Sequence, residues 1–238
     1  MPATIITIAQ QKGGAGKTTL AAHLALAWAA HHRVGVIDID PQASLAQWFR
    51  LRKARLGALA PDIDVAAITG WRVAREVERQ ARRHDIVLID SAPHAETEAR
   101  IAVRAATLVL VPVQPSPMDV WATRATLELA RAERVPALLV LNRVPSRANL
   151  TEPMTAALAE LGATLATVRI GNRVALAAAL AEGKGIHEAA PGSRATEEIA
   201  GLAEDVLART AARSAAREQH ASSHANKIPL APTQWGRG

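Results

Sequence analysis

A glycine-rich loop between a short β-branched run and a long helical pattern constrains the fold of this chain more than any other feature. The run TIITIA spans residues 4–9, the loop QQKGGAGKTT spans residues 10–19, and good helix formers continue over residues 18–32. A strand, a glycine-rich turn and a helix N-terminus in this order form the context of a phosphate-binding loop, because backbone N–H groups and the positive helix end then face the phosphates. The loop therefore predicts a nucleotide site in an α/β domain.

Apolar strands and helical patterns alternate along the rest of the chain. Strands are expected at residues 34–40, 85–90, 107–113, 136–142 and 163–170. Helices are expected at residues 43–54, 71–83, 118–133, 151–161, 173–182 and 194–216. Continuous apolar strands separated by helices are typical of a mostly parallel, twisted sheet with helices on both faces. The fold class predicted is therefore an α/β P-loop NTPase.

Polar residues stand where several of these strands end. Asp38 and Asp40 close the second strand, Asp90 closes the third, and Asn142 follows the fifth. In open parallel sheets, ligands bind beyond the carboxyl ends of the strands. These side chains are therefore expected to gather around the glycine-rich loop.

The composition limits the chemistry and the partners. The 238 residues include no cysteine, which excludes disulfides, thiolate zinc sites and cysteine-ligated iron–sulfur clusters. Neither a signal peptide nor a membrane span is expected, so a cytoplasmic protein is predicted. The net charge of +6 fits a polyanionic partner, either nucleic acid or an anionic membrane, but also a general preference for arginine. We expect one domain over residues 1–213 and a polar, flexible tail over residues 214–238.

The loop resembles the deviant Walker A motif, K-G-G-x-G-K-T-T, of the ParA/MinD family of partition and positioning ATPases. That variant does not need glycine in the first slot, which Gln11 occupies here. The resemblance covers roughly residues 4–207 and is closest to the short, ParF-like partition ATPases. It implies that Lys12 reaches across an ATP-dependent homodimer to the partner's nucleotide, in the manner of an arginine finger.

The resemblance also assigns roles to individual residues, with ATP and Mg²⁺ as ligands. Lys17 would reach the β- and γ-phosphates, and Asp40, in a D-x-D-P-Q sequence, would orient the attacking water, so the expected catalytic residues are Lys12, Lys17 and Asp40. The residues expected to hold the magnesium ion, directly or through its bound water, are Thr18, Asp40 and Asp90. The expected nucleotide-binding residues are Lys12, Gly13, Gly14, Ala15, Gly16, Lys17, Thr18, Thr19, Asn142 and Arg143.

Residues 110–129, LVPVQPSPMDVWATRATLEL, resemble the dimer-interface stretch of the short partition ATPases. Only nine residues precede Gln10, so a helix-turn-helix and operator-specific repression are not expected. Non-specific contact with DNA phosphates is expected instead. The candidates for it are Arg169, Arg173, Lys184 and Arg194, and a second basic cluster is FRLRKARLG at residues 49–57.

The function predicted is an ATP-dependent partition or positioning ATPase that associates with the nucleoid. A ParB-like or small adaptor protein would stimulate slow hydrolysis, and the cargo would be a plasmid, a chromosome or a protein cluster. Two alternatives remain open. A MinD-like ATPase that cycles on a membrane needs a basic amphipathic helix near the C-terminus, and a small-molecule ATP-dependent ligase needs a substrate pocket.

Overall fold

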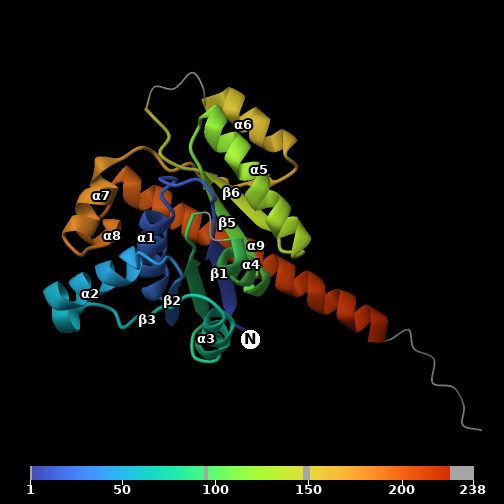
Figure 1. Ribbon diagram of the computed structural model, residues 1–238. Coiled ribbons are helices and arrows are strands. Elements are labelled where there is room, and N and C mark those ends of the chain that lie inside the picture. The colour runs from blue at the N-terminus through green and yellow to red at the C-terminus, as the bar shows by residue number, and fades with distance from the viewer. Residues whose placement is uncertain (1, 94–95, 147–150, 226–238) are drawn as a thin grey trace, which may run out of the picture.

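The computed structural model describes residues 2–93, 96–146 and 151–225 (Figure 1). Seven parallel strands form one sheet in the order β3-β2-β4-β1-β5-β6-β7. The strands are β1 (Thr4–Ile8), β2 (Val34–Asp38), β3 (Asp64–Ala67), β4 (Ile86–Asp90), β5 (Leu108–Val113), β6 (Ala137–Leu141) and β7 (Thr164–Leu165). The strands β2, β4 and β5 are buried along their whole length, which explains their continuous apolar sequences.

Helices cover both faces of the sheet (Figure 1). They are α1 (Lys17–Ala29), α2 (Ser44–Leu56), α3 (Arg72–Ala81), α4 (Glu96–Ala105), α5 (Pro117–Ala132), α6 (Thr151–Glu160), α7 (Val174–Ala181), α8 (Ile186–Ala189) and α9 (Arg194–Ala225), with a short 3-10 turn at Gly57–Leu59. Alternate strand residues supply the two cores. Ile6 and Ile8 pack with α1 and α9 on one face, whereas Val109 and Val111 pack with α5 on the other.

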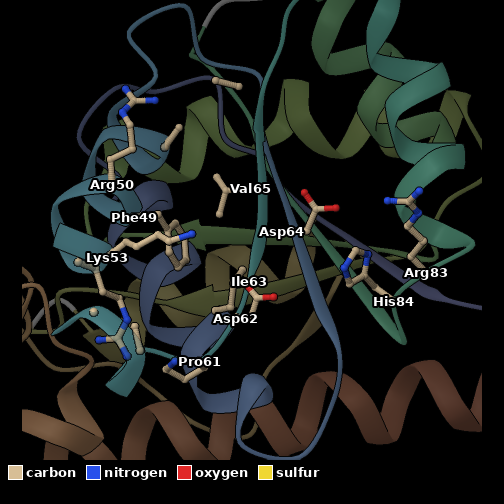
Figure 2. Close-up of a pocket in the computed structure, with 15 residues that line it drawn as sticks. Phe49, Arg50, Lys53, Pro61, Asp62, Ile63, Asp64, Val65, Arg83 and His84 are labelled. Atoms are coloured by element: carbon tan, nitrogen blue, oxygen red, sulfur yellow. The ribbon is translucent and has the colours of Figure 1, made fainter.

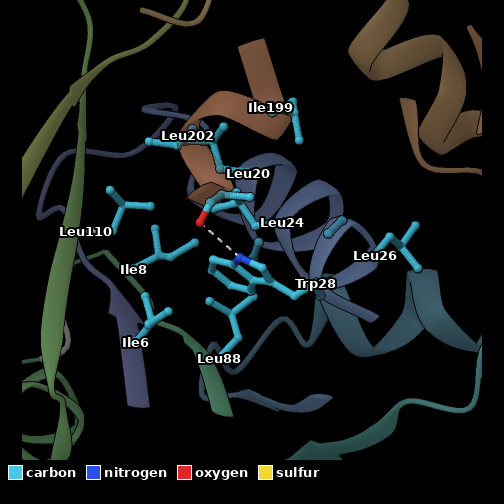
Figure 3. Packing of buried hydrophobic residues seen from close by; sticks show 14 of the residues in the cluster. Ile6, Ile8, Leu20, Leu24, Leu26, Trp28, Leu88, Leu110, Ile199 and Leu202 are labelled. Carbon is cyan, nitrogen blue, oxygen red and sulfur yellow. Dashed lines mark hydrogen bonds between the residues drawn. The ribbon is translucent and has the colours of Figure 1, made fainter. Parts of the chain in front are cut away.

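The core under α1 fixes the helix that the glycine-rich loop opens. Figure 3 shows Trp28 among leucine and isoleucine side chains of β1, α1, β4, β5 and α9. The indole N–H of Trp28 donates to the carbonyl of Ala203 at 3.2 Å, so α9 is tied to the last turn of α1. The start of α1 is thereby attached to a rigid, close-packed body.

The sheet confirms the α/β fold class, the parallel strands and six of their positions to within a few residues. The seventh strand, β3, was not predicted because its sequence DVAA is short, half exposed and lies at the sheet edge. The helices α4 and α8 were also missed. The helix expected at residues 194–216 is longer than predicted, because α9 continues to Ala225. Alanine and other helix formers, without Gly or Pro, continue the helix there.

The remainder of the expected tail, residues 226–238, lies outside the described residues, and the domain boundary at residue 213 stays a prediction. No helix within the described ranges is long and apolar enough to span a bilayer.

Candidate functional site

The glycine-rich loop connects the end of β1 to the first residue of α1. Gly16 is the N-cap of α1 and has φ 89°, a left-handed conformation that glycine adopts without strain. A Cβ atom at Gly16 would lie 2.5 Å from the Asn142 amide nitrogen. Any larger residue would therefore collide with the end of β6, so the loop conformation depends on glycine at this position.

Lys17 lies at the base of the loop and is buried, with only 7% of its surface exposed. Burial lowers the pKa of the Lys17 amine, whereas the negative charges of Asp90 and then Asp40 act to raise it. A buried cation with anions around it provides a strong field for an incoming phosphate. The structure thus places Lys17 at the base of the loop near Asp90 and Asp40, and its contact with phosphate stays a prediction.

Asp90 ends β4 directly beside Asp38 at the end of β2, since the parallel register pairs the two residues. Burial raises the pKa of Asp90 to about 7, and the nearby Asp38 and Asp40 add to this. The hydrogen bond from Thr18 acts in the opposite direction. One carboxylate oxygen of Asp90, Oδ1, is buried and has no partner among the described residues. An unpaired buried oxygen of this kind fits a cation or a metal-bound water.

The residues present fit a magnesium ion held together with a nucleotide. No group of three or more acidic or histidine side chains capable of holding a metal is found in the described part of the chain. Mg²⁺ commonly binds through one or two protein ligands, with phosphate oxygens and water completing its shell. Thr18, Asp90 and Asp40 could therefore serve a magnesium ion that arrives with ATP.

The two acids after β2 have different environments. Asp38 is fully buried, and its carboxylate accepts the backbone N–H groups of Asp40 at 3.1 Å and Ala46 at 3.0 Å. It therefore fixes the turn into α2. Asp40 is partly exposed, and among the described residues its carboxylate accepts one backbone N–H, that of Gln42 at 2.9 Å. The carboxylate that can turn toward a ligand is thus that of Asp40.

Asn142 supports the loop from β6. Its amide donates to the carbonyl of Ala15 at 2.7 Å, and the side chain is buried. The adjacent Arg143 is exposed and has φ 54°, a left-handed conformation that is unusual for arginine. This geometry gives Asn142 a role in holding the loop, while the adenine contact expected for both residues stays a prediction.

The second lysine of the loop, Lys12, forms an ion pair within its own chain. Its amine lies 2.5 Å from the Asp119 carboxylate near the start of α5. The Lys12 side chain is 37% exposed, whereas that of Asp119 is 2% exposed. Asp119 also accepts the Ser116 hydroxyl, and its other oxygen has no partner among the described residues. Lys12 is therefore held at the surface of the loop by a buried anion of the same subunit.

The four cations named individually from the sequence as DNA contacts are each paired with a glutamate. Arg169 lies 2.6 Å from Glu152, and Lys184 lies 3.0 Å from Glu182. Arg173 and Arg194 share Glu198, at 2.6 Å and 3.6 Å. The structure places all four on the domain as expected, but none is a free positive charge.

The sequence prediction missed several polar residues that hold the loop. Gln10 is buried and bonds to Thr123 at 3.0 Å and Thr126 at 3.3 Å, both on α5. Gln114 donates to the carbonyl of Gly14 at 3.1 Å. These contacts join residues more than 90 positions apart, so only the polar character of the 110–129 stretch could have indicated them. The loop and the start of α5 consequently form one connected unit.

A strand, a glycine-rich loop, a buried lysine and a strand-end aspartate at one sheet edge define a P-loop nucleotide-binding domain. The chain belongs to the CobQ/CobB/MinD/ParA nucleotide-binding family, whose model matches residues 6–186. Members of the ParA/MinD group are ATPases, and the fold described above is theirs.

This chain aligns with two known proteins over nearly their whole length. The maintenance of carboxysome distribution protein A of Halothiobacillus neapolitanus is 28% identical over 209 residues, covering 85% of this chain and 95% of that protein. The chromosome-partitioning ATPase Soj of Thermus thermophilus is 32% identical over 238 residues, covering 86% of this chain and 95% of Soj. An ATP complex of a Cyanothece McdA variant superposes with a TM-score of 0.74 at 18% identity, covering 86% of this chain and 96% of that one. This last likeness supports the fold alone.

Proposed function

We propose that this chain is a positioning ATPase of the ParA type, whose ATP-bound homodimer binds DNA without sequence preference. The observation that carries the proposal is the pair of lysines in one loop. Lys17 is buried beside Asp90, within its own site, whereas Lys12 is held at the loop surface by Asp119. A lysine at the surface of a phosphate loop can serve the nucleotide of a second subunit.

In this proposal the release of Lys12 from Asp119 accompanies dimer formation. The ion pair holds the amine toward α5, so the amine must leave Asp119 before it can contact a partner's triphosphate. The ATP phosphates offer Lys12 more negative charge than one carboxylate does, which offsets the loss of the pair. Asp119 lies near the start of α5, so its release also couples the nucleotide to the surface of residues 110–129.

Hydrolysis would use the acids at the sheet edge. Asp40, which is partly exposed and lightly bonded, orients the attacking water, and Lys17 binds the transferred phosphoryl group. When bound, Mg²⁺ would neutralise part of the phosphate charge next to Thr18 and Asp90. The free chain would hydrolyse ATP slowly, and a ParB-like or small adaptor protein would complete the site.

The relatives indicate the general kind of cargo and not its identity. Their names describe carboxysome distribution for one and chromosome partitioning for the other. We accordingly assign this chain a cytoplasmic, nucleoid-associated role in moving either a DNA region or a protein cluster. The relatives and the loop supply the support for this assignment.

The proposal is tested by retention of the protein on immobilised duplex DNA with ATP, with ADP, and for Lys12→Ala with ATP. We expect retention only for the parent protein with ATP. Equal retention in the three conditions would contradict the coupling between nucleotide and DNA. Flotation with anionic liposomes serves as a further arm, and ATP-dependent membrane binding without DNA binding would favour the MinD-like alternative.

A further inference from the structure

One face of α3 carries a row of arginines that the nucleotide site does not use. These arginines are separated by three, four and three residues, the spacing that places side chains on one face of a helix. We call them the arginine stripe: Arg72, Arg75, Arg79 and Arg82. Arg82 follows the last helical residue but retains helical dihedral angles. The opposite face of α3 is fixed in the core through Val73 and Val77, so the stripe faces outward.

The arginine stripe borders a hollow of about 390 Å³, which Ile68, Trp71 and Glu76 also line. Trp71 is 78% exposed at the start of the helix. Arg79 is already engaged, at 2.6 Å from Glu76 and 3.1 Å from Asp64. The stripe therefore combines an aromatic surface, a hollow and a set of guanidinium groups.

The other three arginines of the stripe are exposed, and none of them forms an ion pair with any residue that the structure describes. Like charges three and four residues apart on a helix destabilise it. The two glutamates of α3 do not cancel the positive charge of the stripe. Glu76 is already bound by Arg79 and Gln80, and Glu78 supplies one negative charge against the three remaining arginines. An anionic partner would remove this repulsion.

Several other basic groups on the surface are already compensated. The candidates around α7 and α9 are each paired with a glutamate, as described above. A hollow of about 580 Å³ between α2 and β3 contains Arg50 and Lys53, but Figure 2 shows Asp62 and Asp64 among its lining residues. The arginine stripe differs from these groups because three exposed arginines without an ion pair among the described residues lie in one row along a single helix face.

We propose that the arginine stripe and Trp71 bind the phosphate backbone of duplex DNA. This inference rests on the proposed function and names the surface that makes the DNA contact. From Arg72 to Arg82 the stripe spans eleven residues, or about 15 Å over ten helical steps, along which a duplex presents roughly nine phosphate charges. Contacts of guanidinium groups with phosphates carry no base information, so the binding is independent of sequence.

A membrane surface fits the stripe less well than DNA. A helix that lies in a bilayer must bury an apolar face. The apolar face of α3 is occupied by the core, and Trp71 is the one large exposed hydrophobic residue beside the stripe. α3 begins after the end of β3 and runs back toward the start of β4.

The test compares three full-length proteins with ATP and Mg²⁺: the parent, the triple variant Arg72→Ala, Arg75→Ala, Arg82→Ala, and the same three positions changed to lysine. Binding of a fluorescein-labelled duplex of mixed sequence is followed by anisotropy over a range of salt concentrations. We expect the alanine variant to bind roughly tenfold to a hundredfold more weakly. The slope of log K against log salt should become shallower by roughly 2 to 3, at about 0.9 per lost phosphate contact. The lysine variant should retain most of the binding, because the charges remain.

The matched control removes the compensated cations Arg169, Arg173 and Lys184, and should weaken binding less than the alanine variant does. ATP binding and ATP-dependent dimer formation, measured in parallel, should be unchanged in the alanine variant. DNA binding that survives in the alanine variant but is lost in the control would overturn the stripe assignment and leave the proposed function intact. Stripe-dependent binding to phosphatidylserine vesicles in place of DNA would overturn it as well. If the parent itself bound no DNA with ATP, the DNA part of the proposed function would fail independently of the stripe.

Discussion

The nucleotide edge of the sheet and the outer face of α3 are both rich in charge, but burial separates them. At the sheet edge, Lys17 and Asp90 are buried and each shifts the pKa of the other. On α3, the exposed arginines are surrounded by solvent. Charges in a low-dielectric site interact strongly and tolerate little change, whereas exposed charges interact weakly and are screened by salt. The first region is therefore suited to chemistry and the second to reversible association.

The largest effect is expected for Lys17→Ala. Removing this cation leaves the phosphates and the buried Asp90 without their counter-charge, so ATP binding should weaken about 1,000-fold, on the order of 4 kcal/mol. Titration with a fluorescent ATP analogue measures the affinity of the parent and of the variant. Lys53→Ala, which removes an exposed lysine of α2, should leave the affinity unchanged. Similar losses in both variants would break the distinction between buried and exposed cations.

A second large effect concerns His23, which is fully buried in α1 below the loop. Its ring contacts the carbonyl of Leu176 at 3.1 Å and accepts the N–H of Ile186 at 3.1 Å, so the neutral form fits both. Burial lowers the pKa of His23 from 6.5 to about 4. As the pH falls from about 6.5 to about 4, this histidine takes up a proton in the unfolded chain but not in the folded chain. The contribution of His23 to the free energy of unfolding should therefore decrease by about 3 kcal/mol.

Urea unfolding of the parent and of His23→Gln over this pH range tests that expectation. The variant should show a flatter dependence, while His31→Gln, at an exposed position, should follow the parent. Stabilities of the parent and of His23→Gln that changed in parallel through this interval would show that His23 is not held neutral in the fold.

Asp40→Asn should slow ATP hydrolysis about 100-fold, because the amide cannot accept a proton from water. Dimer formation with ATP should persist, since the carboxylate acts on the water and not on the second subunit. Phosphate release measures the rate, and Asp62→Asn, at an exposed position near β3, is the control. An unchanged rate in Asp40→Asn would assign the catalytic carboxylate elsewhere.

The smallest effect is expected for single arginines on the surface. Arg75→Ala should weaken DNA binding about threefold at moderate salt and reduce the salt slope by about 0.9. Arg169→Ala should have a smaller effect, because Glu152 already neutralises that guanidinium group. Anisotropy titrations resolve the difference, and the reverse order of effects would place the DNA surface near α6 and α9 instead of α3.

The sequence predicted the fold and the loop well because both depend on local patterns. Apolar strand runs and the spacing of Gly16, Lys17 and Thr18 are visible without a structure. The edge strand β3 was missed because a half-exposed strand needs no continuous apolar run. The stripe on α3 has a visible spacing, but only the structure distinguishes its unpaired arginines from the paired cations near α9.

The contacts that position the site were beyond the reach of the sequence. Lys12 and Asp119 are separated by 107 residues, and Asn142 and Ala15 by 127. Such pairs form only when the strand order places β5 next to β1 and β6 next to β5. The motif predicts which residues bind the nucleotide, whereas the folded chain shows what holds those residues in place.

The central claim is that Lys12 exchanges Asp119 for the triphosphate of a second subunit. Light scattering of size-separated protein tests it most directly, with the parent and Lys12→Ala each loaded with ATP or ADP in an Asp40→Asn background that slows hydrolysis. The account predicts dimers only for ATP-loaded protein that retains Lys12, and monomers in the other three samples. Dimers of ATP-loaded Lys12→Ala as stable as those with Lys12 would contradict it.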